Sequence, residues 1–154
     1  MRATTSLPAP AGQDRDGAWQ ATIVPRAFAV FLVLHGLVHL IGFTVPWRLG
    51  GLRGSEYSTL ILNRSIEVGD TAVKLLGLLW LAAAIAFIVV GAMVWRGHPW
   101  AGRTTVALLL GSAFLCTVDL PSSVMGLVID VALLALLAVA PSRLLLRPSS
   151  WANG

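Results

Sequence analysis

The sequence is poor in charged residues. Asp, Glu, Lys and Arg make up 12% of its 154 residues, whereas soluble globular domains carry about 25%. Hydrophobic residues make up 56%. A soluble chain of this length could not bury so much apolar surface, because small domains leave a large share of their surface in water. The composition excludes an ordinary soluble domain and favours lipid as the solvent.

Cysteine and the common catalytic motifs are also scarce. The single cysteine, Cys116, cannot form an intramolecular disulfide, and it lies within an apolar run. The sequence contains no glycine-rich phosphate loop, no Ser-His-Asp pattern and no CxxC pair. We therefore expect no ATP binding by this chain, and no motif predicts an enzyme.

The basic residues are ten arginines and one lysine. They fall at the ends of apolar runs rather than in a patch with interleaved aromatic residues, which predicts no nucleic-acid partner. The bias toward arginine, together with abundant Ala, Leu, Val and Gly, is typical of a GC-rich bacterial genome.

Four apolar runs predict four transmembrane helices, because a hydrocarbon core about 30 Å thick needs about 20 apolar residues in a helix. The runs cover residues 27–47, 71–95, 104–120 and 122–140. We predict an all-α, up-down four-helix membrane bundle over residues 25–141. A re-entrant hairpin of the last two runs is the alternative. Residues 1–24 are predicted to be a mobile polar tail, and residues 142–154 a cytoplasmic tail.

The basic residues also predict the orientation. With both termini in the cytoplasm, seven of them lie on the inner side and four on the outer side, as the positive-inside rule favours. Trp47, Trp95 and Trp100 lie at the ends of runs, where interfacial aromatic belts occur. We expect a multi-pass protein of the inner (plasma) membrane.

Ionisable side chains within the runs are the informative residues, since each costs about 2.5–3.5 kcal/mol at the bilayer centre. They are His35 and His39 in the first run, Lys74 in the second, Asp119 in the third and Asp130 in the fourth. At about 1.5 Å per helical residue, all of them fall in the outer half of the membrane or near its midplane. We therefore expect the polar faces of the helices to converge at one level.

His35, His39 and Asp130 are predicted to form a ligand-binding or proton site. The two histidines lie one turn apart on one helix face, and His39 and Asp130 match in depth. Three interpretations compete for the histidines. They could bind a metal with Asp130 or Cys116 as a further ligand, although no H-E-x-x-H motif is present. His39 and Asp130 could change protonation as a pair, or neutral histidines could hydrogen-bond across helices for packing.

Two further pairs complete the candidate site residues. Lys74 and Asp119 both lie near the outer surface, and we predict an ion pair between them at the rim. Trp80 and Cys116 are predicted to wall the polar cluster, although ordinary packing also explains both.

Three stretches resemble a group of small, functionally uncharacterised four-span membrane proteins of actinobacteria. They are HGLVHLIGF at 35–43, GLLWL at 77–81 and GLVID at 126–130. In layout the chain is also similar to the DoxX-like four-helix membrane proteins, which are tied to redox and thiol-stress complexes. These resemblances imply a membrane bundle and assign no catalytic residue.

Three functions remain open on the sequence alone. The first is an accessory or carrier protein with a polar intramembrane site for a proton-linked or small polar ligand. The others are a DoxX-like redox component that binds quinone or metal, and a structural subunit of a larger membrane complex. The lipid bilayer is the expected partner, and other membrane subunits or a second copy of the chain stay open. A water-filled cavity at His39 and Asp130 would favour a carrier, whereas a dry hydrogen-bonded cluster would favour the structural role.

Overall fold

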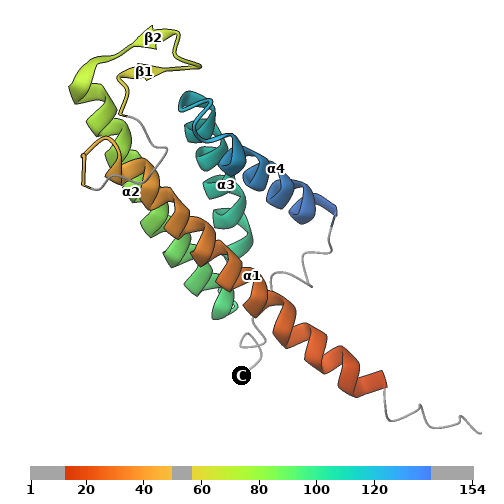
Figure 1. The fold of residues 1–154 in the computed structure, drawn as a ribbon. Helices are drawn as coiled ribbons and strands as arrows, with labels where there is room; N and C mark the ends of the chain where they lie inside the picture. The colour runs from red at the N-terminus through yellow and green to blue at the C-terminus, as the bar shows by residue number, and fades with distance from the viewer. Residues whose placement is uncertain (1–12, 50–56, 140–154) are drawn as a thin grey trace, which may run out of the picture.

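A computed structural model describes the backbone of residues 13–49 and 57–139 and the side chains of residues 23–49 and 57–139. Its regular structure is α-helical apart from one small hairpin (Figure 1), which confirms the all-α class. The elements are α1 (Gln13–Thr44), β1 (Leu60–Ile61), β2 (Ile66–Glu67), α2 (Gly69–Trp95), α3 (Ala101–Val118) and α4 (Val124–Val139). The predicted C-terminal tail and the first twelve residues lie outside the described part.

Three of the described helices are long and apolar enough to cross a membrane, namely the Ile23–Thr44 part of α1 and all of α2 and α3. Helix α4 is apolar but has 16 residues, about 24 Å at 1.5 Å per residue, so the fourth span stays a prediction. Large apolar side chains are exposed on all four of these helices, for example Leu34, Leu79, Phe114 and Val128. Such a surface fits lipid rather than water, and it indicates a multi-pass membrane protein.

Helix α1 begins earlier than the sequence suggests. Its first residue is Gln13, so residues 13–24, which the sequence places in the polar tail, are helical. Pro25 lies inside this helix, where it lacks an N–H donor but does not end the helix. Apolar periodicity reports only the part of a helix that packs or meets lipid, so it does not reveal the polar turns before Ile23.

Helix α2 lies beside the C-terminal part of α1, whereas the first turns of α1 extend beyond it (Figure 1). Glycine makes the close approach of the two helices possible. A Cβ atom at Gly36 would lie 2.5 Å from the Cβ atom of Phe87, and one at Gly91 would lie 2.7 Å from Cγ2 of Val33. Both distances are too short for real contacts. Small residues at helix contacts are a general device of membrane bundles, because lipid supplies no hydrophobic force between helices.

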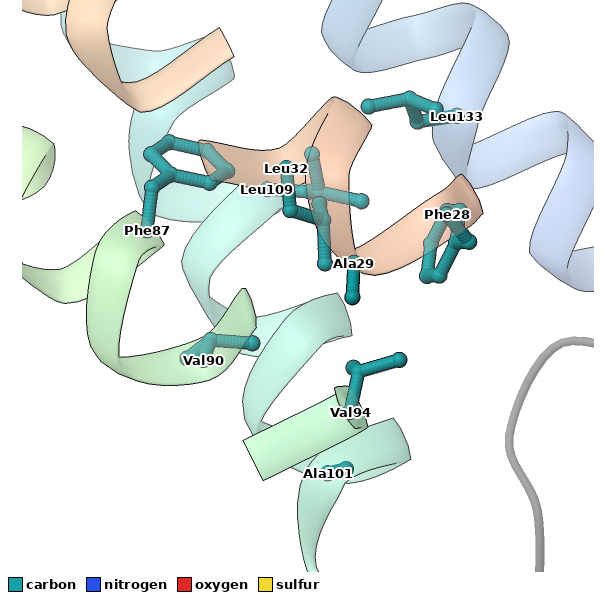
Figure 2. Packing of buried hydrophobic residues seen from close by; sticks show 9 residues of the cluster. All are labelled: Phe28, Ala29, Leu32, Phe87, Val90, Val94, Ala101, Leu109 and Leu133. Atoms are coloured by element: carbon teal, nitrogen blue, oxygen red, sulfur yellow. The ribbon is translucent and has the colours of Figure 1, made fainter. Parts of the chain in front are cut away.

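One apolar cluster joins all four helices near the start of the apolar part of α1. Figure 2 shows its side chains packed together across the bundle. Its buried members are Phe28, Ala29, Leu32, Phe87, Val90, Val94, Ala101, Leu109 and Leu133. A second, smaller cluster lies toward the other end of the bundle and contains Trp80, Leu115 and Cys116. We call these the large and the small apolar cluster.

The hairpin of β1 and β2 contacts the connection between α3 and α4. The backbone N–H groups of Leu62 and Asn63 donate to the carbonyl oxygens of Val118 and Leu120, each at 2.9 Å. Val118 is the last residue of α3 and Leu120 lies two residues beyond it, and the last carbonyl groups of a helix have no partners within the helix. The hairpin thus provides hydrogen-bond donors for carbonyl groups at the end of α3 and in the connection to α4.

The close approach of α1 and α2 predicts opposite effects for two identical substitutions. Gly36→Ala should lower the free energy of unfolding in mild detergent by about 1–3 kcal/mol, because the new Cβ overlaps Phe87. Gly111→Ala on α3 is the matched control, since nothing lies within 4 Å of its Cβ position. Alanine there should stabilise the helix by up to about 1 kcal/mol. Equal effects of the two changes would contradict this packing.

Candidate functional site

Three helices bring four polar side chains together in the interior, and we call this set the polar row. Helix α1 contributes His35 and His39, α3 contributes Ser112, and α4 contributes Asp130. The Nε2 atom of His35 lies 2.8 Å from Oδ1 of Asp130. Oγ of Ser112 lies 2.6 Å from Oδ2 of Asp130 and 2.7 Å from Nε2 of His39. The contacts form one continuous line from His39 to His35.

The helix backbone fixes the orientation of His39. Its Nδ1–H group donates to the carbonyl oxygen of His35, one turn earlier, at 3.0 Å. This bond holds the ring so that Nε2 points toward α3. The i, i+4 spacing of the two histidines therefore does more than place them on one face, because the first residue supplies the acceptor that orients the second.

Asp130 is the most completely buried ionisable residue among Asp, Glu, Lys, Arg and His of the described chain. Its exposed fraction is 0%, against 4% for His35 and 3% for His39. The Sγ atom of Cys116 adds a third, weaker contact at 3.7 Å from Oδ2. Every buried side-chain nitrogen and oxygen within the described ranges has a hydrogen-bond partner. The polar groups of the row are thus hydrogen-bonded to one another, which offsets the cost of burying them away from water.

Aromatic rings from α2 enclose the two imidazoles. The ring centroid of Phe87 lies 4.9 Å from that of His35 and 5.0 Å from that of His39. The ring of Trp80 lies 5.1 Å from His39. Both rings are uncharged. Helix α2 therefore covers the histidines with aromatic side chains and adds no ionisable group to the polar row.

The polar row lies between the large and the small apolar cluster. Leu32 of the large cluster precedes His35 by about one turn on α1, and Cys116 of the small cluster follows Ser112 by one turn on α3. Water is thereby kept from both sides of the row. In such surroundings electrostatic interactions are stronger than in water, and an unpaired charge is correspondingly more costly.

Comparisons of the chain with family models, with curated proteins and with solved structures give no match.

His35, His39 and Asp130, which the sequence predicts as one site, do lie together, but their pairing differs from the prediction. Asp130 contacts His35 directly, and His39 reaches it through Ser112. Helix α3 has 18 residues against 27 in α2. The place where α3 ends determines where α4 begins, and Asp130 of α4 then lies beside His35.

Ser112 belongs to the site although the sequence does not single it out. It shares one face of α3 with Thr105 and Cys116, and all three are buried. A hydroxyl on a polar face is a weak signal by itself, since serine and threonine in membrane helices usually bond their own backbone. Thr105 does so, donating to the carbonyl oxygen of Ala101 at 2.7 Å, whereas Ser112 bonds across helices.

The predicted ion pair between Lys74 and Asp119 is wrong. Nζ of Lys74 lies 2.6 Å from Oδ2 of Asp70, one turn earlier on the same helix, because i, i+4 neighbours meet without help from tertiary structure. Arg48 approaches Asp70 at 3.9 Å, and Tyr57 donates a hydrogen bond to the same carboxylate, which raises the pKa of Tyr57. Asp119 instead follows the last residue of α3 and donates its backbone N–H to Leu115.

The remaining candidates lie against the polar row. Trp80 and Cys116 are packed beside His39 and Asp130, as expected for its walls. As metal candidates, His35 and His39 direct their Nε2 atoms to Asp130 and Ser112. Within the described ranges no three ligating side chains gather into a metal-binding group, so the metal interpretation gains no support.

The central place of Ser112 predicts a specific loss of stability. Ser112→Ala should leave Nε2 of His39 and Oδ2 of Asp130 without their short contacts, at a cost of about 1–3 kcal/mol. This exceeds the ~0.6 kcal/mol typical of one hydrogen bond between membrane helices. Thr117→Val is the control, because that exposed hydroxyl bonds only the carbonyl of Ala113. Unfolding in detergent measures both, and equal losses would contradict the shared role of Ser112.

Proposed function

We propose that this chain is a small inner-membrane accessory or carrier protein whose polar row is a proton-linked site. In this proposal α4 is the fourth span and both termini face the cytoplasm. The observation that carries it is the continuous line of short hydrogen bonds joining His39, Ser112, Asp130 and His35 inside an apolar interior.

A proton suits this site better than a larger polar ligand. Each buried side-chain nitrogen and oxygen within the described ranges is already paired inside the protein, so none is left to recognise a substrate. A proton needs no free volume and can be exchanged by shifting along existing hydrogen bonds. Histidine is the side chain that most readily changes charge between about pH 5 and 8. The arrangement corresponds to an occluded state, closed on both sides by the apolar clusters.

The proposed orientation is supported by two pairs of arginine and tryptophan at the end of the bundle that holds the large apolar cluster. The guanidinium of Arg26 lies 5.3 Å from the ring centroid of Trp95, and that of Arg103 lies 5.2 Å from Trp100. Arginine and tryptophan together are typical of the membrane interface, and an excess of arginine marks the cytoplasmic side.

A structural role is the second candidate, and the same complete pairing favours it. Hydrogen bonds between helices stabilise membrane bundles without any exchange of protons. The DoxX-like redox function has only the resemblance in its support. The decision between a proton-linked site and a structural one therefore depends on whether the row titrates while the protein stays folded.

Trp80 provides a reporter for this question, since its ring lies 5.1 Å from that of His39 and a protonated imidazole quenches indole fluorescence. In a variant with Trp80 as its sole tryptophan, placed in liposomes, fluorescence should fall when the pH is lowered from neutral and His39 gains a proton. Asp130→Asn should abolish or displace this transition.

The third histidine supplies the matched control. His98 lies in the turn between α2 and α3, exposed and away from the polar row. His98→Gln should therefore leave the transition unchanged. Flat fluorescence in the Trp80 reporter at every pH at which the protein stays folded, or an unchanged transition in Asp130→Asn, would exclude the proton-linked function and leave the structural one.

A further inference from the structure

Each hydrogen bond of the polar row needs one hydrogen atom, and the donors and acceptors restrict where these hydrogens lie. The carbonyl oxygen of His35 can only accept, so Nδ1 of His39 must carry a hydrogen. Nε2 of His39 then has two choices at its 2.7 Å contact with Ser112. It accepts the hydroxyl hydrogen as a neutral imidazole, or it donates to the hydroxyl oxygen as an imidazolium.

Ser112 has one hydrogen but two short contacts, at 2.7 Å to His39 and 2.6 Å to Asp130. If the hydroxyl donates to His39, then Oδ2 of Asp130 must carry a proton and donate to Ser112. If the hydroxyl donates to Asp130 as a carboxylate, His39 must be the imidazolium. In both arrangements Nε2–H of His35 donates to Oδ1 of Asp130.

The two arrangements contain the same number of protons and have zero net charge. To pass from the first to the second, the O–H bond of Asp130 breaks and its proton forms a bond to Oγ of Ser112. The original hydroxyl proton of Ser112 moves at the same time to Nε2 of His39. Nothing enters or leaves the protein, and Ser112 is a hydroxyl before and after.

With any other number of protons, the polar row has either an unsatisfied hydrogen-bond contact or a net charge. With one proton fewer, two lone pairs face each other at one of the contacts of Ser112. With one proton more, the row carries a positive charge in apolar surroundings. The other titratable groups near the row are Cys116, whose Sγ atom lies 3.7 Å from Asp130, and Asp119, about one turn beyond Cys116. Helix α2 presents only the rings of Phe87 and Trp80. None of these supplies a compensating cation.

Charge separation inside the bundle is costly, because buried ions lose their hydration by water. We infer that Asp130 is a neutral carboxylic acid that donates to Ser112, and that Ser112 is the positioning residue through which Asp130 and His39 exchange a proton. The exchange rests on the proposed function, since it names the groups that hold and pass the proton in that site.

Infrared difference spectroscopy of the protein in liposomes tests the first part. A carboxylic-acid C=O band should be present at neutral pH, lost in Asp130→Asn and kept in the matched variant Asp119→Asn. When His39 gains a proton, Ser112 must turn its hydroxyl toward Oδ2, which disturbs the proton on the carboxyl group. The band should therefore shift at the same pH as the Trp80 fluorescence changes.

Ser112 variants test the second part. In Ser112→Ala the band and the fluorescence should change at different pH values, whereas Ser112→Thr, which keeps a hydroxyl, should restore their coincidence. A merely structural role for Ser112 would not link the two signals. If Ser112→Ala does not fold, the coincidence in the wild type and in Ser112→Thr still decides.

The outcomes separate this inference from the proposed function. A fluorescence transition without an Asp130 acid band overturns the neutral carboxyl and leaves the proton-linked function standing. If the acid band of Asp130 keeps its position while the Trp80 fluorescence changes with pH, the exchange through Ser112 is overturned. A band with flat fluorescence overturns the proposed function and supports Asp130 as the neutral acid.

Discussion

The arrangement of the bundle depends on one constraint, that the carboxyl group of Asp130 must be satisfied where no water reaches it. Its exposed fraction is 0%, and its two oxygens are met by His35 from α1 and Ser112 from α3. Loss of either partner leaves a buried polar group whose cost no lipid can offset. The carboxyl group therefore holds three helices in one register, which apolar packing alone would leave loosely defined.

The apolar parts of the bundle serve this arrangement. Glycines such as Gly36 bring α1 against α2, and the rings of Phe87 and Trp80 then cover the histidines. The two apolar clusters exclude water above and below the row. The hydrogen bonds of the polar row thus depend on the close apolar packing around them, because these bonds are stronger where water is excluded.

Composition and periodicity were sufficient to predict the helical class and the approach of the α1 histidines to Asp130, because a buried charge in a membrane helix must find a partner. They could not predict which histidine meets Asp130, since that depends on where the short α3 ends and α4 begins. They also missed Ser112, whose hydroxyl has many alternative partners. The rim pair at Lys74 was misassigned because a neighbour on the same helix, Asp70, competes with any distant partner.

A double-mutant cycle between His35 and Asp130 tests the central claim most directly. The free energy of unfolding in mild detergent would be measured for His35→Leu, for Asp130→Leu and for the double variant. Contact between the two side chains predicts a coupling energy of about 1 kcal/mol or more, with the double variant less destabilised than the sum of the single changes. Strict additivity would mean that the two side chains do not meet, and the buried polar row would not exist.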